Sequence, residues 1–234
     1  MTHSTIGEGT LAARIRRIGV LGRLLEAATV LWVIAQGVVT VAVFLYGETW
    51  VAAYRADPDS DPVLGGYKTW ALGELVVMVV AWGLTCAWLW QIRTHAELVE
   101  PDPQELTRTQ LVFGWIVPVF MMWVPYQAVT EAAVPTVRVS RGREAGADLP
   151  VLLRLWWGAY LVMLLAILLP HGYTLGSYAH LPAIRSLSVV AVGVTAVSAV
   201  LWLRVVERVT EAQTDVHVLA EAVDTVRQAE AARP

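Results

Sequence analysis

Long runs of apolar residues, separated by shorter polar stretches, dominate this chain. A helix rises about 1.5 Å per residue and a bilayer's hydrocarbon core is about 30 Å thick, so a run of about 20 apolar residues can cross it. Four runs approach or exceed that length, at residues 24–46, 70–92, 151–169 and 187–203. The pattern predicts an all-α fold, a polytopic membrane helical bundle with four transmembrane helices. Residues 24–203 would form the membrane domain, behind a cytoplasmic segment at 1–23.

A fifth apolar stretch lies between the second and third runs. Twenty-two residues without a charge separate Arg108 from Glu131. Pro118 and Pro125 lie inside this stretch, and each proline removes a backbone donor and interrupts a regular helix. Irregular backbone at membrane depth is tolerated only where protein or water satisfies its polar groups. We therefore expect residues 110–130 to form a proline-broken hairpin that is re-entrant or lies at the membrane interface.

The distribution of basic residues favours this hairpin over a fifth span. If residues 110–130 crossed the membrane, a basic cluster and the C-terminal tail would face outward, against the positive-inside tendency. That cluster consists of Arg138, Arg141 and Arg143. If the segment returns to the side it left, every basic cluster is cytoplasmic. We expect four spans with both termini in the cytoplasm, and five full spans are the alternative.

Composition supports a membrane protein and narrows its chemistry. Hydrophobic residues make up 56% of the chain, above the roughly 45–50% of soluble domains. Cys86 is the single cysteine, which excludes a disulfide within the chain and a thiolate metal cluster. No long basic stripe indicates nucleic acid. Nearly all basic residues are arginine, and Ala and Val dominate the apolar ones, which we interpret as the bias of a GC-rich bacterial genome. The expected location is the bacterial cytoplasmic membrane.

A few polar residues interrupt or flank the predicted spans. They are Glu26, Gln36, Glu74 and Arg154. A charge at the bilayer centre costs at least about 2.5–3.5 kcal/mol, so such residues need partners. Glu26 and Glu74 lie near opposite ends of antiparallel helices and cannot share one carboxylate site. We expect Glu26 to pair with Arg154, or with Arg23 or Arg108, and Gln36 to bond across a helix interface. Helix packing is the expected role of this set, with a transport path as the alternative.

Motifs of catalysis are missing from the sequence. We find no H-E-x-x-H, no G-x-S-x-G and no phosphate-binding glycine loop. His171 and His180 lie nine residues apart without an accompanying carboxylate, which is typical of interfacial histidines and not of a metal site. We therefore predict no enzyme activity, no cofactor and no metal.

The residues after the fourth run, 204–234, predict a cytoplasmic amphipathic helix. Its apolar positions recur in steps of three and four, as in a heptad seam. They are Val209, Ala212, Val216, Leu219, Val223 and Val226. Such a seam favours a homodimer or a coil with a partner protein. The alternative is that the helix docks on the hairpin or on residues 94–109 of its own chain.

Four strings of residues resemble a known family. They are Trp88-Leu-Trp-Gln-Ile-Arg-Thr-His-Ala, Phe113-Gly-Trp-Ile-Val-Pro, Trp123-Val-Pro-Tyr-Gln and Arg204-Val-Val-Glu-Arg-Val-Thr-Glu-Ala-Gln. From about residue 20 to 213 the chain resembles an actinobacterial family of small four-span membrane proteins, known only as a domain of unknown function. The family's signatures resemble G-W-x-x-P and W-x-P-Y-Q, carried here by Gly114, Trp115, Pro118, Trp123, Pro125, Tyr126 and Gln127. One departure is His95, where the family tends to have Asn. The resemblance implies a fold and no activity.

Two classes of function remain after the enzyme is set aside. The leading hypothesis is a non-catalytic scaffold, assembly factor or envelope regulator that acts through the hairpin and the cytoplasmic helix. The alternative is an oligomeric carrier or channel for a small solute or ion, because four spans in one chain are few for a transport path.

Overall fold

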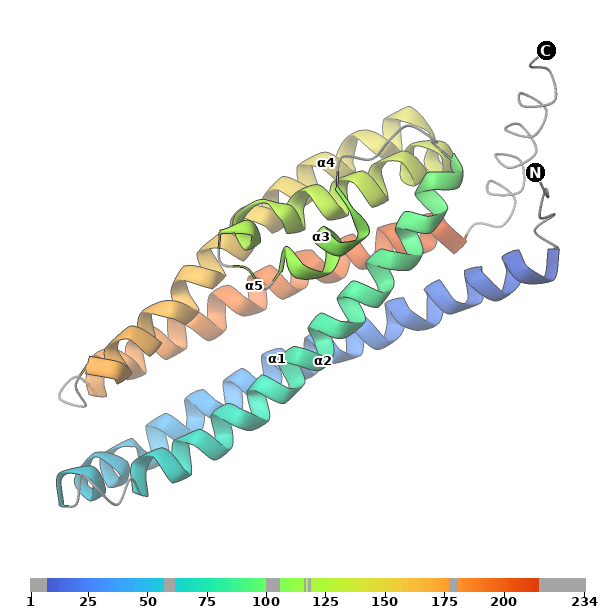
Figure 1. The fold of residues 1–234 in the computed structure, drawn as a ribbon. Coiled ribbons are helices and arrows are strands. Elements are labelled where there is room, and N and C mark those ends of the chain that lie inside the picture. Colours follow the sequence, from blue (N-terminus) through green and yellow to red (C-terminus); the bar gives the residue numbers. More distant parts are fainter. Residues whose placement is uncertain are drawn as a thin grey trace, which may run out of the picture. The chain divides into compact units, whose positions relative to one another are not determined.

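Helices form all the regular structure in the described part of the chain, which covers residues 8–56, 62–99, 106–115, 117, 119–176 and 181–214 of a computed structural model. They are α1 (Glu8–Ala56), α2 (Pro62–Val99), α3 (Arg108–Phe113), the short 3-10 helix η1 (Phe120–Met122), α4 (Val124–Gly176) and α5 (Leu181–Thr214) (Figure 1). No strand occurs within those ranges. The all-α prediction is confirmed.

Four of these helices contain a segment that is long and apolar enough to cross a membrane. The segments are Ala13–Ala53, Thr69–Thr94, Asp148–Leu168 and Leu181–Thr214. The four predicted spans lie within α1, α2, α4 and α5, which extend beyond them. Large apolar side chains cover the outer faces of these helices, for example Leu45, Leu165 and Val190. Such faces are unfavourable in water and suit contact with lipid. The chain is therefore a multi-pass membrane protein.

The chain divides into two compact units. The first, which we call the hairpin unit, contains Met1–Glu26, Gly83–Leu155 and Leu203–Pro234. The second, the span unit, contains Ala27–Trp82 and Trp156–Trp202. Each of the four long helices contributes residues to both units, whereas α3 and η1 belong to the hairpin unit alone.

In the span unit, α1 and α5 pack along each other in opposite directions. Arg185 on α5 donates to the Phe44 carbonyl oxygen at 3.0 Å and forms an ion pair with Glu48 at 3.1 Å. A small cluster of buried side chains lies beside these contacts: Val43, Val51, Leu181 and Ile184. Farther along α5, the rings of Trp156 and Trp202 lie 4.8 Å apart, centroid to centroid, which joins α4 to α5.

In the hairpin unit, the predicted break at residues 110–130 is present. α3 has six residues, about 9 Å of rise, and cannot cross a bilayer. The chain then turns through η1 before α4 begins at Val124. Figure 1 shows the ribbon of α4 bending back between its yellow-green first part and the yellow part that leads to the third span. The chain therefore makes its reversal before the segment that starts at Asp148.

One proline acts differently from the expectation. Pro125 is the second residue of α4, in the first turn of a helix, where the missing N–H has no intrahelical acceptor to lose. Pro125 therefore marks the start of a helix instead of interrupting one. Pro118 lies outside the described residues.

Single cysteines in a Cys86→Ala background test this topology. Thr109 and Asp148 are exposed on either side of the reversal, so Thr109→Cys and Asp148→Cys should react with a membrane-impermeant maleimide from the same side. Ala56→Cys, exposed at the end of α1, should react from the other side. Labelling in intact cells and in inverted vesicles separates the two faces. Reaction of Thr109→Cys and Asp148→Cys from opposite faces would mean that the segment crosses the membrane.

Candidate functional site

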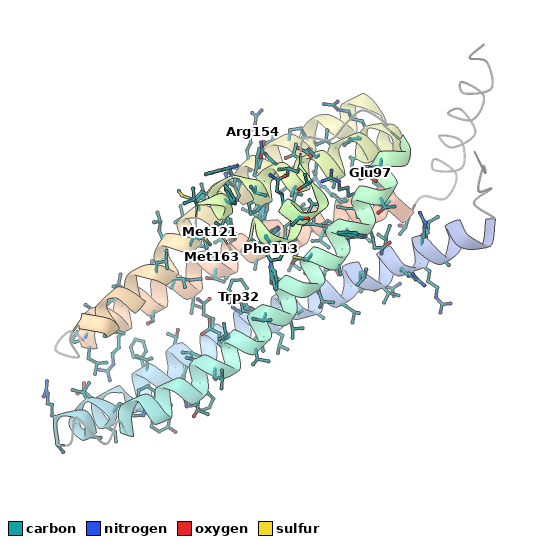
Figure 2. All side chains as sticks on the ribbon, in the orientation of Figure 1. Trp32, Glu97, Phe113, Met121, Arg154 and Met163 are labelled. Atoms are coloured by element: carbon teal, nitrogen blue, oxygen red, sulfur yellow. The ribbon has the colours of Figure 1, made fainter. Side chains whose placement is uncertain are left out.

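The hairpin surrounds a groove of about 450 Å³, within the range of about 300–1,000 Å³ that ligand pockets occupy. Residues of α3, η1 and the first turn of α4, with the segments that join them, form its walls. They are Leu106, Thr109, Gln110, Phe113, Gly114, Val117, Phe120, Trp123, Val124 and Gln127. Figure 2 shows Phe113 on α3 and Met121 in η1 at this part of the chain.

A capping box starts α3 and so positions the first wall of the groove. The side-chain hydroxyl of Thr107 accepts from the backbone N–H of Gln110 at 3.3 Å. The Thr107 backbone N–H donates in return to the Gln110 side-chain oxygen at 2.7 Å. This reciprocal pair satisfies two donors that the first turn of a helix would otherwise leave unbonded.

Successive backbone hydrogen bonds carry the chain from α3 to α4. The N–H of Val117 donates to the Phe113 carbonyl at 3.2 Å, and that of Met121 to the Val117 carbonyl at 2.8 Å. Trp123 then donates to Phe120 at 3.1 Å. Backbone groups away from water need such partners, so these turns allow an irregular segment to lie in or against a bilayer.

Gly114 closes the hairpin through its small size. Its φ of −62° is open to any residue, so the requirement is space and not backbone conformation. A Cβ built at Gly114 would lie 2.7 Å from the Gln110 carbonyl oxygen and 2.7 Å from the Val124 Cβ. The close approach brings α3 against the start of α4, where Leu106, Leu111, Val124 and Ala128 form a buried cluster.

Two charged side chains hold the chain where it enters α3. Arg93, on α2 and 6% exposed, donates from Nη2 to the carbonyl oxygen of Leu106 and from Nε to Glu97 at 3.2 Å. The N–H of Leu106 donates to the Glu131 carboxylate on α4 at 3.3 Å. Hydrogen bonds to charged groups are stronger than neutral ones. This Leu106 clamp, formed by Arg93, Glu97, Leu106 and Glu131, joins the hairpin to α2 and α4.

A second polar contact joins α5 to the same unit. Gln213 is fully buried, and its Nε2 donates to the Thr136 hydroxyl on α4 at 2.9 Å and to the Ile92 carbonyl on α2 at 3.5 Å. Trp88 on α2 donates from Nε1 to the Thr210 hydroxyl on α5 at 3.1 Å. These bonds connect three long helices around the base of the hairpin.

The structure brings most of the predicted signature residues to one place. Gly114, Trp123 and Gln127 line the groove. Trp115 is half-buried beside Gly114, while Pro125 and Tyr126 lie in the first turn of α4. Arg93 and Gln213 belong to strings that resemble the family and Glu131 ends the uncharged stretch, but no role was assigned to any of the three from the sequence. The sequence offered two signals for this site: a charged residue at the end of an apolar run, and the T-x-x-Q pattern at Thr107–Gln110.

The expected pairing of Glu26 with Arg154 does not form. Arg154 is exposed on α4, and Figure 2 shows it extending away from the neighbouring ribbons. Its neighbour Leu153 faces inward instead, which leaves Arg154 on the outer face of the helix. No ion pair joins Glu26 to Arg154, both of which the structure describes. The charges that act on Glu26 are those of Glu207 and Arg23, and the Arg108 side chain lies outside the described part.

Five buried side-chain atoms in the span unit lack hydrogen-bond partners among the residues that the structure describes. Three are nitrogens of half-buried residues: Nε1 of Trp32, Nε1 of Trp82 and Nε of Arg185. The other two belong to buried residues, 7% and 0% exposed: the side-chain oxygen of Gln36 on α1 and the hydroxyl of Thr195 on α5. The bond expected for Gln36 across a helix interface is therefore not made by its oxygen. Glu74 is half-buried and does have an interaction partner.

The predicted C-terminal seam begins inside the chain's own core. Val209 and Ala212 are 0% and 2% exposed within the hairpin unit. Val216, Leu219, Val223 and Val226 lie outside the described residues, so the dimer stays a prediction for those positions. His180 and the His171 side chain are also outside the description. Within it, no group of three or more His, Cys, Asp or Glu residues could hold a metal ion.

Comparison with known families identifies the chain. A family model described as a domain of unknown function, DUF4328, matches residues 67–211, which is more than half of the chain and includes the whole groove. The chain belongs to this family. Searches of curated proteins and of solved structures find no match.

Replacing Gly114 with alanine tests the close approach that shapes the groove. Gly114→Ala should destabilise the protein by about 1–3 kcal/mol, the usual cost of overpacking, because the Gln110 carbonyl belongs to rigid backbone. Gly193→Ala is the matched control, since a Cβ there meets nothing within 4 Å. The control should leave the apparent melting temperature in detergent unchanged or raise it, because alanine favours a helix over glycine. Equal melting temperatures for the two variants would contradict the packing described here.

Proposed function

We propose that this member of the DUF4328 family is a non-catalytic membrane protein that acts by binding, as a scaffold, assembly factor or envelope regulator. Its working part in this proposal is the hairpin, which contacts a partner protein. The partner engages the outer surface of the hairpin, on the residues that do not line the groove.

The observation that carries the proposal is an apolar surface on a segment that is firmly held. Val119 and Met122 are 60% and 57% exposed, and neither lines the groove. The Leu106 clamp and the closure at Gly114 fix the hairpin that presents them. Exposed apolar patches commonly mark surfaces that contact proteins or membranes, and a pre-ordered surface loses less entropy on binding.

The chemistry of the groove favours binding over catalysis. Its described lining contains no Asp, Glu, His, Cys, Lys or Arg. General acid–base catalysis requires a titratable group within hydrogen-bond reach of the reacting atoms. The amides and the hydroxyl that are present can orient a ligand but do not ionise near neutral pH.

The proposal includes an orientation. Both termini and the basic residues near Arg138 lie in the cytoplasm, and the membrane is the bacterial cytoplasmic membrane. Support comes from the positive-inside tendency together with the even number of candidate spans. The hairpin then faces the cytoplasmic side, and a homodimer through the C-terminal helix would lie there as well.

A second candidate function has one observation in its favour. The oxygens of Gln36 and Thr195 are buried in the spans without hydrogen-bond partners in the described part of the chain. Polar groups inside a membrane often mark a solute or ion path. An oligomeric carrier or channel would use these groups, and in that case the hairpin would be a structural plug.

Photocrosslinking in living cells tests the proposed function. A photoreactive amino acid in place of Met122 should give one discrete adduct with a partner protein, because the side chain is exposed on the hairpin. The same residue in place of Val190, equally exposed on α5, should give lipid adducts only. Mass spectrometry of the adducts reads out both positions.

Two results together would contradict the scaffold and support the carrier. Met122 would give no protein adduct, and reconstituted vesicles would show a solute flux that Gln36→Leu abolishes. Val190 supplies the level of chance collisions in the bilayer against which the Met122 adduct is judged.

A further inference from the structure

We infer that the groove of the hairpin holds one acyl chain of a membrane glycerolipid, with the ester end of that chain near Gln127. This inference rests on the proposed function in one respect, that the hairpin binds and does not react. It names a ligand for the groove, whereas the partner protein engages the outer surface at Val119 and Met122.

The lining matches a ligand with a long apolar body. Seven of the ten lining residues are apolar, and three of them are aromatic. The remaining three, Thr109, Gln110 and Gln127, are polar and uncharged. A phosphate or carboxylate would find no countercharge in this described lining, whereas hydrocarbon loses nothing there by leaving the bilayer.

The mouth of the groove opens among side chains that suit lipid. Phe113, Phe120 and Trp123 line the groove and are also 55%, 44% and 44% exposed. They belong to the twenty-two-residue stretch without a charge. Leaving such side chains in water costs about 25 cal/mol per Å² of apolar surface, a cost that hydrocarbon removes. The groove therefore opens toward the bilayer, where acyl chains are the abundant occupants.

The size of the groove favours a thin ligand. A helix with its side chains is about 10 Å across, so about 450 Å³ would hold roughly one turn of it. The groove is therefore too small for more than about one turn of a peptide helix, which can instead lie across the outer surface. A single acyl chain is narrow enough to extend along the groove.

The polar side chains of the lining determine where the ester end of the acyl chain lies. The side-chain oxygen of Gln110 already accepts from the backbone N–H and the hydroxyl of Thr107. Among the described residues, nothing bonds the side-chain amide of Gln127, which is half-buried in the first turn of α4. That amide can donate to an ester carbonyl, which is the one strong acceptor next to an acyl chain.

Native mass spectrometry of the purified full-length protein tests the inference. After a mild detergent wash, the wild-type protein should retain one glycerolipid per chain. Val117→Trp places a large ring in the lining and should lower the lipid-bound fraction several-fold. Val119→Trp, two residues away and outside the lining, should retain the lipid as the wild type does. Equal retention by all three proteins would overturn the inference.

A second measurement uses the wild-type protein alone, so it stands even if Val117→Trp fails to fold. The protein is reconstituted in phosphatidylcholine vesicles that contain a phosphatidylcholine with a diazirine on one acyl chain. After illumination, adducts should concentrate on Phe120 and Trp123 above the level at lipid-facing Leu165. Adducts on the span faces alone would mean that the groove takes no lipid.

The two proposals can fail separately. Loss of the protein adduct at Met122 leaves lipid retention and the diazirine pattern unaffected, because Met122 does not line the groove. Conversely, an empty groove with a protein adduct at Met122 would reject the lipid and keep the scaffold.

Discussion

A chain that leaves the helical conformation in or against a bilayer must satisfy its backbone N–H and C=O groups with protein atoms or water. Here that constraint falls on the segment between α2 and α4. Glu131 accepts from the N–H of Leu106, and Arg93 donates to the carbonyl oxygen of Leu106. In the turns that follow, up to Trp123, backbone N–H groups bond to backbone carbonyls. Because both backbone groups of Leu106 are bonded by charged side chains, the chain can leave the helical conformation there without losing these hydrogen bonds.

Hydropathy and length predicted the four long apolar helices and the break at residues 110–130, because each is a local property of the chain. The role of Pro125 was not predictable in this way, since whether a proline interrupts or begins a helix depends on where that helix starts. The burial of Arg93 depends on a carbonyl thirteen residues away, and the outward position of Arg154 depends on which face of α4 packs inward. Both depend on tertiary packing, which the hydropathy pattern of a single segment does not predict.

Polar and apolar residues of the hairpin unit have separate tasks. The buried charges and amides, such as Arg93 and Gln213, are used to join α2, α4 and α5 around the base of the hairpin. The described lining of the groove contains no charged residue, and its exposed members Phe113, Phe120 and Trp123 are aromatic. A site of this kind is suited to recognising an apolar ligand by shape and to one or two neutral hydrogen bonds. The span unit buries the side-chain oxygens of Gln36 and Thr195, which have no hydrogen-bond partner in the described chain.

Hydrogen–deuterium exchange of the Leu106 amide in reconstituted vesicles tests the central claim most directly. The account predicts slow exchange in the wild-type protein, because the carboxylate of Glu131 holds this N–H. Glu131→Ala should make the exchange fast, while amides of α5 near Gln213 keep their protection. An amide of Leu106 that exchanges in the wild type as fast as in an unfolded peptide, or one that does not respond to Glu131→Ala, would contradict it.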